Sequence, residues 1–382
     1  MSKKIKIIVL IFSLLLVLLS PPLVQAQGEL AILGSSAETE FPSRLNFNLS
    51  ARSNVNITDI RLCYTVDRTS FAEVISEGYI EFTPSTVVDV SWALDMLKVG
   101  GLPPGSTVKY WWRVKDASGK KVETAPAQVL FNDTRYQWRS LTEGKVSVYW
   151  YRGDDSFARE IMLAAQQALE RLAEDTGAYP EKPVKIYVYA NQQDFIGALI
   201  HPQEWVGGVN FPTFHIIAIP IASANINWGK TTIAHELTHQ VIYQVTANPY
   251  NSLPHWLNEG LATYEEGLLS LGLASYLAKA VSEDKLISVR SLCSEFSAFP
   301  EQAYISYAES YSLAEFLITT YGRDKMLELL AAFREGSSYD GALKTVYGFD
   351  MDGLDSLWRD YVNKKYQSAA EWMQPALVTA GF

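Results

Sequence analysis

The spacing of apolar residues in this 382-residue chain changes near Asn132, and this change limits the folds open to it. Before that point apolar and polar residues alternate, as in ITDIRLCYTV (57–66). After residue 252 apolar residues recur every three or four positions. A period of two indicates strands with one buried face, and a period near 3.6 indicates amphipathic helices. The chain is therefore predicted to be multidomain, with an all-β N-terminal domain followed by a domain that ends in helices.

Residues 27–134 are predicted to form the β-domain. A Pro-Gly turn precedes an expected strand at 107–115, and a second turn at 116–119 leads into the next strand. Strands separated by such turns over about a hundred residues favour a β-sandwich. The run LPPGSTVKYWWRV (102–114) resembles the penultimate strand of fibronectin type III domains, which implies a fibronectin III or immunoglobulin-like sandwich. A packing or spacer role is favoured over a specific binding role, because a fold alone carries no function.

Residues 135–382 are predicted to form one domain with two parts. In the α+β part, 135–250, strands are expected at 145–151 and 184–190, a helix at 155–175 and an edge hairpin at 205–220. The remainder, 251–382, is predicted to be helical. Its expected helices are 254–268, 302–321, 324–335, 338–347 and 351–366.

The segment TTIAHELTHQV (231–241) places two histidines four residues apart on a helix. Residues four apart lie on one helix face, so His235 and His239 can both point at one zinc ion, which prefers imidazole nitrogen in tetrahedral geometry. Glu236 lies about 100° round the helix. From there it can accept the proton of a metal-bound water, as in metal-assisted hydrolysis. A helix that only exposes His and Glu on a solvated polar face could carry the same motif by chance.

A third ligand is expected in PHWLNEGLATYEEG (254–267), twenty residues after His239. Glu259 lies there among apolar helical residues. A carboxylate in such a context is costly to bury unless it is paired or coordinated. Glu259 is therefore predicted to complete the zinc site.

HELTH followed by WLNEGLA resembles the gluzincin metallopeptidases, the thermolysin-like and aminopeptidase N-like group. The helical tail, with YAESYSLAEFLITTYG (307–322), resembles the exported peptidase MA-like family, and the resemblance covers roughly residues 140–366. It implies that His235, His239 and Glu259 bind Zn²⁺ and that Glu236 is the general base.

Two departures from the family pattern bear on activity. Aminopeptidase N-type enzymes have an edge-strand glutamate that holds the free amino terminus of the substrate, and the matching segment WVGGVNFPTF (205–214) has no acid. This favours an endopeptidase, with an aminopeptidase as the alternative. Thermolysin-like enzymes orient the first histidine with an aspartate four residues after the ligand glutamate. That position is Thr263 here, so another group must orient His235; Glu265 and Glu266 are interpreted as a solvated helix face.

An oxyanion formed during peptide cleavage needs a hydrogen-bond donor. Tyr307 is the candidate, and Tyr304, Tyr311 and His255 are its rivals. His201 and His215 are interpreted as ordinary residues, although His215 on the hairpin could line the cleft. Gly207 and Gly208 would let an extended peptide approach the edge strand, where main-chain pairing is common.

The N-terminal sequence MSKKIKIIVLIFSLLLVLLSPPLVQAQ predicts a secretory signal peptide over residues 1–26, with an uncleaved membrane anchor as the alternative. The formal net charge of −10 and the lack of a basic cluster argue against nucleic acid as a partner. Cys63 and Cys293 are interpreted as buried apolar residues without a disulfide framework.

Together these observations predict an exported zinc-dependent endopeptidase that acts on peptide or protein substrates. A zinc-containing extracellular binding or adhesion protein without turnover is the alternative from another class. The intact Glu236 argues against that alternative, because a site without turnover does not need the base.

Overall fold

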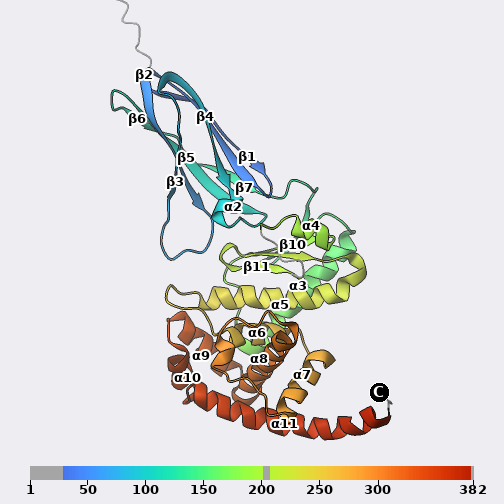
Figure 1. The fold of residues 1–382 in the computed structure, drawn as a ribbon. Helices are drawn as coiled ribbons and strands as arrows, with labels where there is room; N and C mark the ends of the chain where they lie inside the picture. Colours follow the sequence, from blue (N-terminus) through green and yellow to red (C-terminus); the bar gives the residue numbers. More distant parts are fainter. Residues whose placement is uncertain (1–28, 201–206, 380–382) are drawn as a thin grey trace, which may run out of the picture.

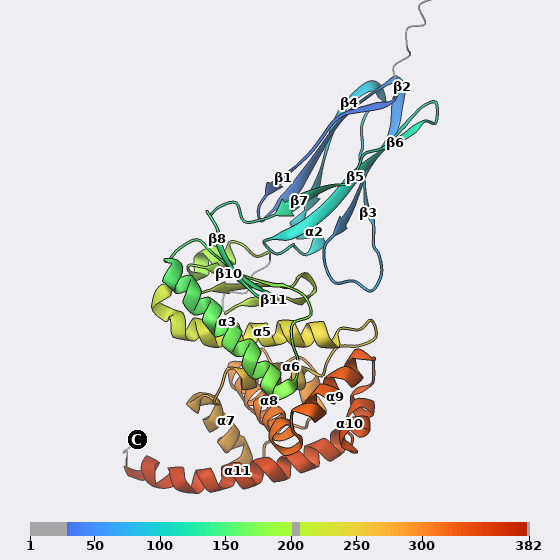
Figure 2. The ribbon, with the colours of Figure 1, turned by 180° about the vertical axis from the view of Figure 1, so that it is seen from behind.

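A computed structural model describes residues 29–200 and 207–379 of the chain. The predicted signal peptide (1–26) and His201 lie outside these described residues. The chain forms an elongated molecule with a strand-rich N-terminal part at one end and a helical part at the other (Figure 1). A five-stranded sheet lies between them (Figures 1 and 2). The predicted β-rich N-terminal region and helical C-terminal part are confirmed.

The N-terminal part is organised around one long strand, β2, whose two halves have different neighbours. From Arg44 to Arg52 it pairs with β1 and β4. From Ile57 onward it pairs with β3 and β5, and β5 in turn pairs with β6 and β7. All of these pairings are antiparallel. The elements are β1 (Ala31–Glu40), β2 (Arg44–Val66), β3 (Ser76–Tyr79), β4 (Ser85–Asp95), the short helix α2 (Met96–Val99), β5 (Ser106–Asp116), β6 (Lys121–Glu123) and β7 (Ala127–Phe131).

Residues of the two ladders that share β2 pack in one core. Phe47, from the first half of β2, lies with its ring 4.9 Å from the ring of Tyr110 on β5. Phe41 and Phe131 make a similar contact at 5.0 Å. Every second residue of the first half is buried, as the alternation in the sequence predicts: Leu45, Phe47, Leu49 and Ala51.

The five-stranded sheet has the order β11-β12-β10-β9-β8. The three central strands are parallel, and the two edge strands β8 and β11 are antiparallel to their neighbours. The elements of this layer are β8 (Arg139–Glu143), β9 (Val146–Trp150), α3 (Asp155–Thr176), β10 (Val184–Tyr189), α4 (Gln192–Ile196), β11 (Val209–Phe211) and β12 (Ile216–Pro220). The predicted hairpin therefore exists, and its first strand forms an edge of the sheet.

The two faces of the sheet pack into different cores. Ile186 and Val188 of β10 pack with residues of α3 and α5. Tyr187 and Tyr189 point to the opposite face and join the core of the N-terminal strands. Lys185 donates a hydrogen bond from Nζ to the carbonyl oxygen of Gly105 at 2.9 Å, which ties the sheet to the loop before β5.

The helical part is built on α6, which lies against α8. A Cβ on Gly260 of α6 would lie 2.3 Å from the carbonyl oxygen of Ser310 on α8, so only glycine permits this approach. The helices are α5 (Ile226–Thr246), α6 (His255–Glu265), α7 (Leu271–Ser282), α8 (Pro300–Tyr321), α9 (Arg323–Arg334), α10 (Tyr339–Tyr347) and α11 (Met351–Thr379). The sequence interpretation had not anticipated α4, α7 or β8, and it ended the last helix at residue 366.

Within the described ranges no helix is long and apolar enough to cross a bilayer. Both cysteines are free. Cys63 is fully buried as expected, whereas Cys293 is only half-buried.

Candidate metal centre

His235, His239 and Glu259 converge between α5 and α6. The Nε2 atoms of the two histidines are 3.1 Å apart. Glu259 Oε2 lies 3.7 Å from Nε2 of His235 and 3.6 Å from Nε2 of His239. The two helices thus bring together the three side chains that the sequence singled out, which form a group able to hold a metal ion.

The spacing of the three donor atoms fits a small tetrahedral ion. Ligands about 2.0–2.1 Å from a tetrahedral zinc lie about 3.3 Å from one another. The three observed separations, 3.1, 3.6 and 3.7 Å, lie close to that value. Two imidazoles and one carboxylate are also the donor set of zinc sites that keep a fourth position open.

The charges at the centre depend on one another. Burial acts to raise the pKa of Glu259, but the neighbouring histidines, His239 above all, together lower that pKa to about 2. Burial likewise acts to lower the pKa of His239, and the Glu259 carboxylate raises it to about 9. The buried carboxylate therefore keeps a positive charge beside it. A divalent cation that binds here would replace this proton.

Glu266 orients His235, and this role was missed in the sequence. His235 donates a hydrogen bond from Nδ1 to Glu266 Oε1 at 2.7 Å, which leaves Nε2 directed at the centre. The interpretation of Glu266 as part of a solvated face is wrong. Seven residues are about two helical turns, so the position of Glu266 relative to Glu259 was a usable signal. Thr263 is buried, and its hydroxyl has no partner among the described residues.

Replacing Glu266 with glutamine is expected to weaken metal affinity by about 10–100-fold, because the ring of His235 loses a charged hydrogen-bond acceptor. Competition with a chromophoric zinc chelator measures the change. Thr263→Val is the matched control, since Thr263 holds the position expected for the orienting group but makes no such contact. An equal loss of affinity in both variants would contradict the assignment.

Glu265 also differs from its interpretation as a solvated residue. Its side chain is only 1% exposed, and both carboxylate oxygens lack a hydrogen-bond partner in the part of the chain that the structure describes. Burial, assisted by the negative charge of Asp175 and opposed by Arg171, raises its pKa to about 8. The α6 helix thus carries a carboxyl group that folding favours in its protonated form.

This raised pKa predicts a pH-dependent stability. Between pH 4.5 and about 8 the folded chain binds a proton at Glu265 that the unfolded chain has released, so stability falls as the pH rises through this window. The Glu265→Gln variant removes the charge and is expected to melt at a higher temperature than the wild type at pH 8, with little difference at pH 4.5. Thermal unfolding at the two pH values measures this. A gain of equal size at both pH values would show that titration is not its cause.

Glu236 lies on the side of α5 that faces the edge strand. A Cβ on Gly208 would lie 3.2 Å from Glu236 Oε1, so the backbone just before β11 passes close to the carboxylate. Asn210 on β11 donates a hydrogen bond to the carbonyl oxygen of Glu236 at 2.8 Å. The general-base candidate therefore lies next to β11, the edge strand of the sheet among the described residues.

Of the three candidate tyrosines, Tyr307 is the one whose pKa is affected by the charged residues of the centre. Burial raises its pKa, and the negative charges of Glu259 and Glu236 raise it further. Tyr304 is exposed and packs on Tyr276 instead. Tyr311 is buried against Tyr264. The surroundings of Tyr307 therefore favour it over Tyr304 and Tyr311 as the oxyanion donor.

His255 remains close to the centre without entering it. Its positive charge, when present, helps to lower the pKa of Glu259. Its ring packs edge-on against Phe296 at 4.4 Å, and Phe296 in turn packs against Tyr307 at 5.1 Å. His255 thus supports the wall of the site on which Tyr307 lies.

His215 joins three parts of the molecule. Gln240 of α5 donates a hydrogen bond to its Nδ1 at 3.1 Å. Its Nε2 lies 3.0 Å from the hydroxyl of Thr69, in the loop between β2 and β3. His215 therefore holds the N-terminal part against the turn after β11.

One comparison with known proteins identifies a family for this chain. A family model described as the Peptidase MA superfamily matches residues 164–364, more than half of the chain.

No curated protein matches this chain. Among solved structures it is similar to Legionella pneumophila aminopeptidase A in complex with aspartic acid, at 11% identity and a TM-score of 0.39, over 87% of this chain and 50% of that one. It is also similar to OgpA from Akkermansia muciniphila, at 9% identity and a TM-score of 0.21, over 29% of this chain and 30% of that one. The chain spans half or less of those two proteins.

Proposed function

The chain belongs to the Peptidase MA superfamily and carries a gluzincin-like domain, and from this we propose that it is an exported zinc-dependent endopeptidase. The observation that carries the proposal is the convergence of His235, His239 and Glu259 within 4.8 Å, on two helices beside an edge strand. A donor set of two imidazoles and one carboxylate is that of zinc peptidases.

Zinc held by these three residues would polarise the peptide carbonyl and make water acidic enough to attack it. Glu236 would accept the proton of that water and pass it to the leaving amine. Glu266 keeps His235 in the tautomer that presents Nε2. The edge strand β11 would pair with the substrate backbone and hold the scissile bond near Glu236.

The preference for internal bonds rests on the edge strand. No acid is present at 207–211, so nothing in this stretch would pair with a free amino terminus. The small Gly208 leaves room for a substrate backbone next to the Glu236 carboxylate. These features support an endopeptidase over an aminopeptidase.

The test is a library of N-terminally blocked peptides, and the same peptides unblocked, incubated with the purified mature protein, with bound metal measured by mass spectrometry. We expect cuts at internal bonds that stop with a chelator and return with zinc. Cleavage of only the unblocked peptides would make the protein an aminopeptidase. Bound zinc without any cleavage would favour the alternative, a zinc-containing binding protein without turnover.

Tyr307→Phe is expected to lower kcat by about 10²-fold, the scale of removing one oxyanion donor, with little change in KM. The hydroxyl would act on charge that develops during the reaction and not on the bound substrate. Steady-state kinetics on one blocked peptide measures the effect, with Tyr304→Phe as the matched control. A kcat unchanged by Tyr307→Phe would remove Tyr307 from the mechanism.

We also propose that residues 1–26 are a cleaved signal peptide and that residues 27–134 are a fibronectin III or immunoglobulin-like sandwich, followed by the peptidase unit at 135–382. The division of β2 between two ladders that pack in one core supports the sandwich. Mass spectrometry of the exported protein tests the signal, since a mature chain that begins at Met1 would contradict cleavage. A crystal structure in which the ladders do not face each other would contradict the sandwich.

A further inference from the structure

A cavity of about 650 Å³ lies one helical turn from the metal centre. Tyr243 lines it, and Tyr243 follows His239 by four residues, so it continues the face of α5 that carries both histidines. Asn258 and His255 also line it, and they lie one and four residues before Glu259 on α6. Both helices therefore lead directly from the metal ligands into this cavity, whose size is that of a ligand site.

The N-terminal part supplies one wall of the cavity. Residues 67–75, which connect β2 to β3 and are named here the 67–75 loop, extend to the C-terminal end of α5 (Figure 1). Within it, Thr69 donates a backbone hydrogen bond to the carbonyl oxygen of Thr213 at 2.7 Å. Lys182 donates another from Nζ to the Thr69 hydroxyl at 3.3 Å. These bonds anchor the loop two residues before Phe71, whose side chain lines the cavity.

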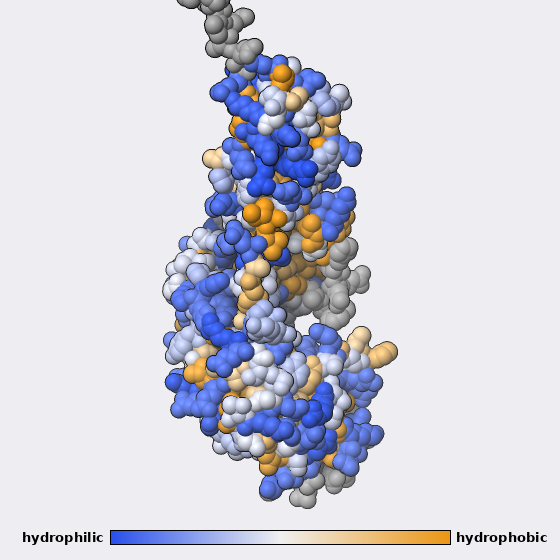
Figure 3. Space-filling model, turned by 90° about the vertical axis from the view of Figure 1, so that its left-hand side faces the viewer, coloured by the Kyte–Doolittle hydropathy of each residue, from blue (hydrophilic) through white to orange (hydrophobic). Residues whose placement is uncertain are grey.

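The side chain of Phe71 is largely exposed, so a substrate could cover it. Its side chain is 56% exposed, and it lines both the 650 Å³ cavity and a smaller one of about 210 Å³ beside Tyr243 and Ala247. Hydrophobic surface is visible between the N-terminal strands and the rest of the molecule (Figure 3). An exposed aromatic residue anchored at a site is typical of a recognition contact.

The residues that line the 650 Å³ cavity indicate which chemical class of ligand it can bind. Phe71, Tyr243, Tyr250 and Leu253 offer aromatic and aliphatic surface. Glu295 adds a negative charge at the rim, where its side chain is 93% exposed. Such a cavity suits a large apolar side chain and disfavours an acidic one.

We propose that this cavity is a substrate subsite for a large apolar side chain, aromatic above all, and that Phe71 of the N-terminal part sets that preference. The proposal rests on the proposed peptidase function and names the specificity of that same site. The N-terminal strands then take part in substrate selection and do more than act as a spacer.

The direction of β11 places the subsite relative to the scissile bond. Gly208, at the start of this segment, lies beside Glu236, and the turn after Phe211 leads through Thr213 to the 67–75 loop. An extended peptide paired antiparallel with β11, the more stable pairing, has its amino-terminal residues at the Phe211 end. The cavity therefore receives a side chain from the amino-terminal side of the cut bond.

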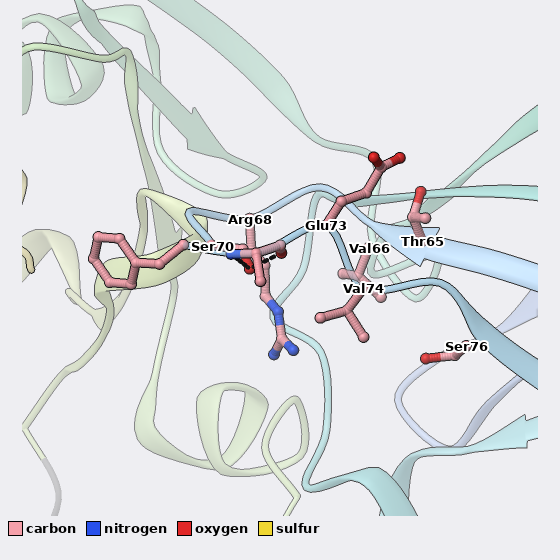
Figure 4. A pocket seen from close by; sticks show the side chains of 9 residues that line it. Thr65, Val66, Arg68, Ser70, Glu73, Val74 and Ser76 are labelled. Atoms are coloured by element: carbon pink, nitrogen blue, oxygen red, sulfur yellow. Dashed lines mark hydrogen bonds between the residues drawn. The ribbon is translucent and has the colours of Figure 1, made fainter. Parts of the chain in front are cut away.

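The test compares Phe71→Ala with Val74→Ala in the full-length mature protein. Val74 is the matched control because it lies in the same loop and is 59% exposed, but it does not line the 650 Å³ cavity. It lines a pocket of about 420 Å³ on the loop itself, which Phe71 also lines. Figure 4 shows that pocket, with Arg68 and Val74 on one side of the loop and Glu73 on the other. Substrates are blocked peptides that carry Phe, Ala or Asp at each position before the cut bond.

At one such position we expect wild type to prefer Phe over Ala and Ala over Asp. Phe71→Ala should lower kcat/KM about tenfold for the Phe peptide and leave the Ala peptide nearly unchanged, while Val74→Ala changes neither. A Phe71→Ala enzyme with unchanged selectivity, or one in which all peptides lose equally, would overturn the subsite. A preference confined to positions after the cut bond would overturn its placement.

Binding to the Glu236→Gln variant separates this proposal from the proposed function. Fluorescence anisotropy with a labelled Phe peptide reports binding without turnover, and adding Phe71→Ala should weaken it about tenfold. If wild type cuts nothing but this difference in binding remains, the peptidase fails and the subsite stands. If the protein cuts peptides and Phe71→Ala leaves this binding unchanged, the subsite fails alone.

Discussion

Replacing Glu236 with glutamine is expected to lower the rate of peptide cleavage by roughly 10²–10⁴-fold, the range of general acid–base catalysis. The amide keeps the size of the side chain beside Gly208 but cannot accept a proton. The three proposed zinc ligands are untouched, so the variant should hold as much zinc as the wild type.

Initial rates on one blocked peptide, with zinc content from the same samples, measure this loss. Glu170→Gln, on the exposed face of α3, is the matched control and should behave as wild type. A Glu236→Gln variant with full zinc and more than a tenth of the wild-type rate would rule out Glu236 as the base.

The Gly260→Ala variant is expected to lose about 3 kcal/mol of folding stability, at the upper end of the cost of an added core methyl group. The new methyl group would overlap the carbonyl of Ser310, a backbone group that cannot rotate away, and would also press on Ala314. Metal affinity should fall as well, because Glu259 is the preceding residue on α6.

Thermal unfolding followed by circular dichroism measures the loss. Gly272→Ala is the control, because Gly272 lies on helix α7 with open space around the added methyl group, and alanine there should raise stability slightly. Equal melting temperatures for Gly260→Ala and wild type would show that α6 and α8 can separate at little cost.

The grouping of the three candidate ligands could be predicted from the sequence because each part of it is local. His235 and His239 are one turn apart on one helix, and Glu259 stands out as an acid in an apolar helical segment. The β-rich N-terminal region and most of the C-terminal helices followed from apolar periodicity for the same reason.

The remaining parts depend on where elements end and meet. Glu266 follows Glu259 by about two helical turns, but it reaches His235 because the last turn of α6 faces α5, and that packing is not visible in the sequence. Glu265 looks like a surface acid in the sequence, but packing buries it. Phe71 lies more than 150 residues before α5, in a loop with no periodic pattern. That it lines the same cavity as Tyr243 depends on how the two parts of the chain pack.

The alternate faces of β10 have an evolutionary consequence. Tyr187 and Tyr189 belong to the core of the N-terminal strands, while Ile186 and Val188 belong to the core with α3 and α5. The sheet is therefore shared between the two cores, and neither part would be covered by polar side chains at this contact if the other were removed. A recombination event that exchanged the N-terminal strands for an unrelated module would leave aromatic side chains in water. The two parts are therefore expected to be inherited together, and substitutions at their contact should be correlated.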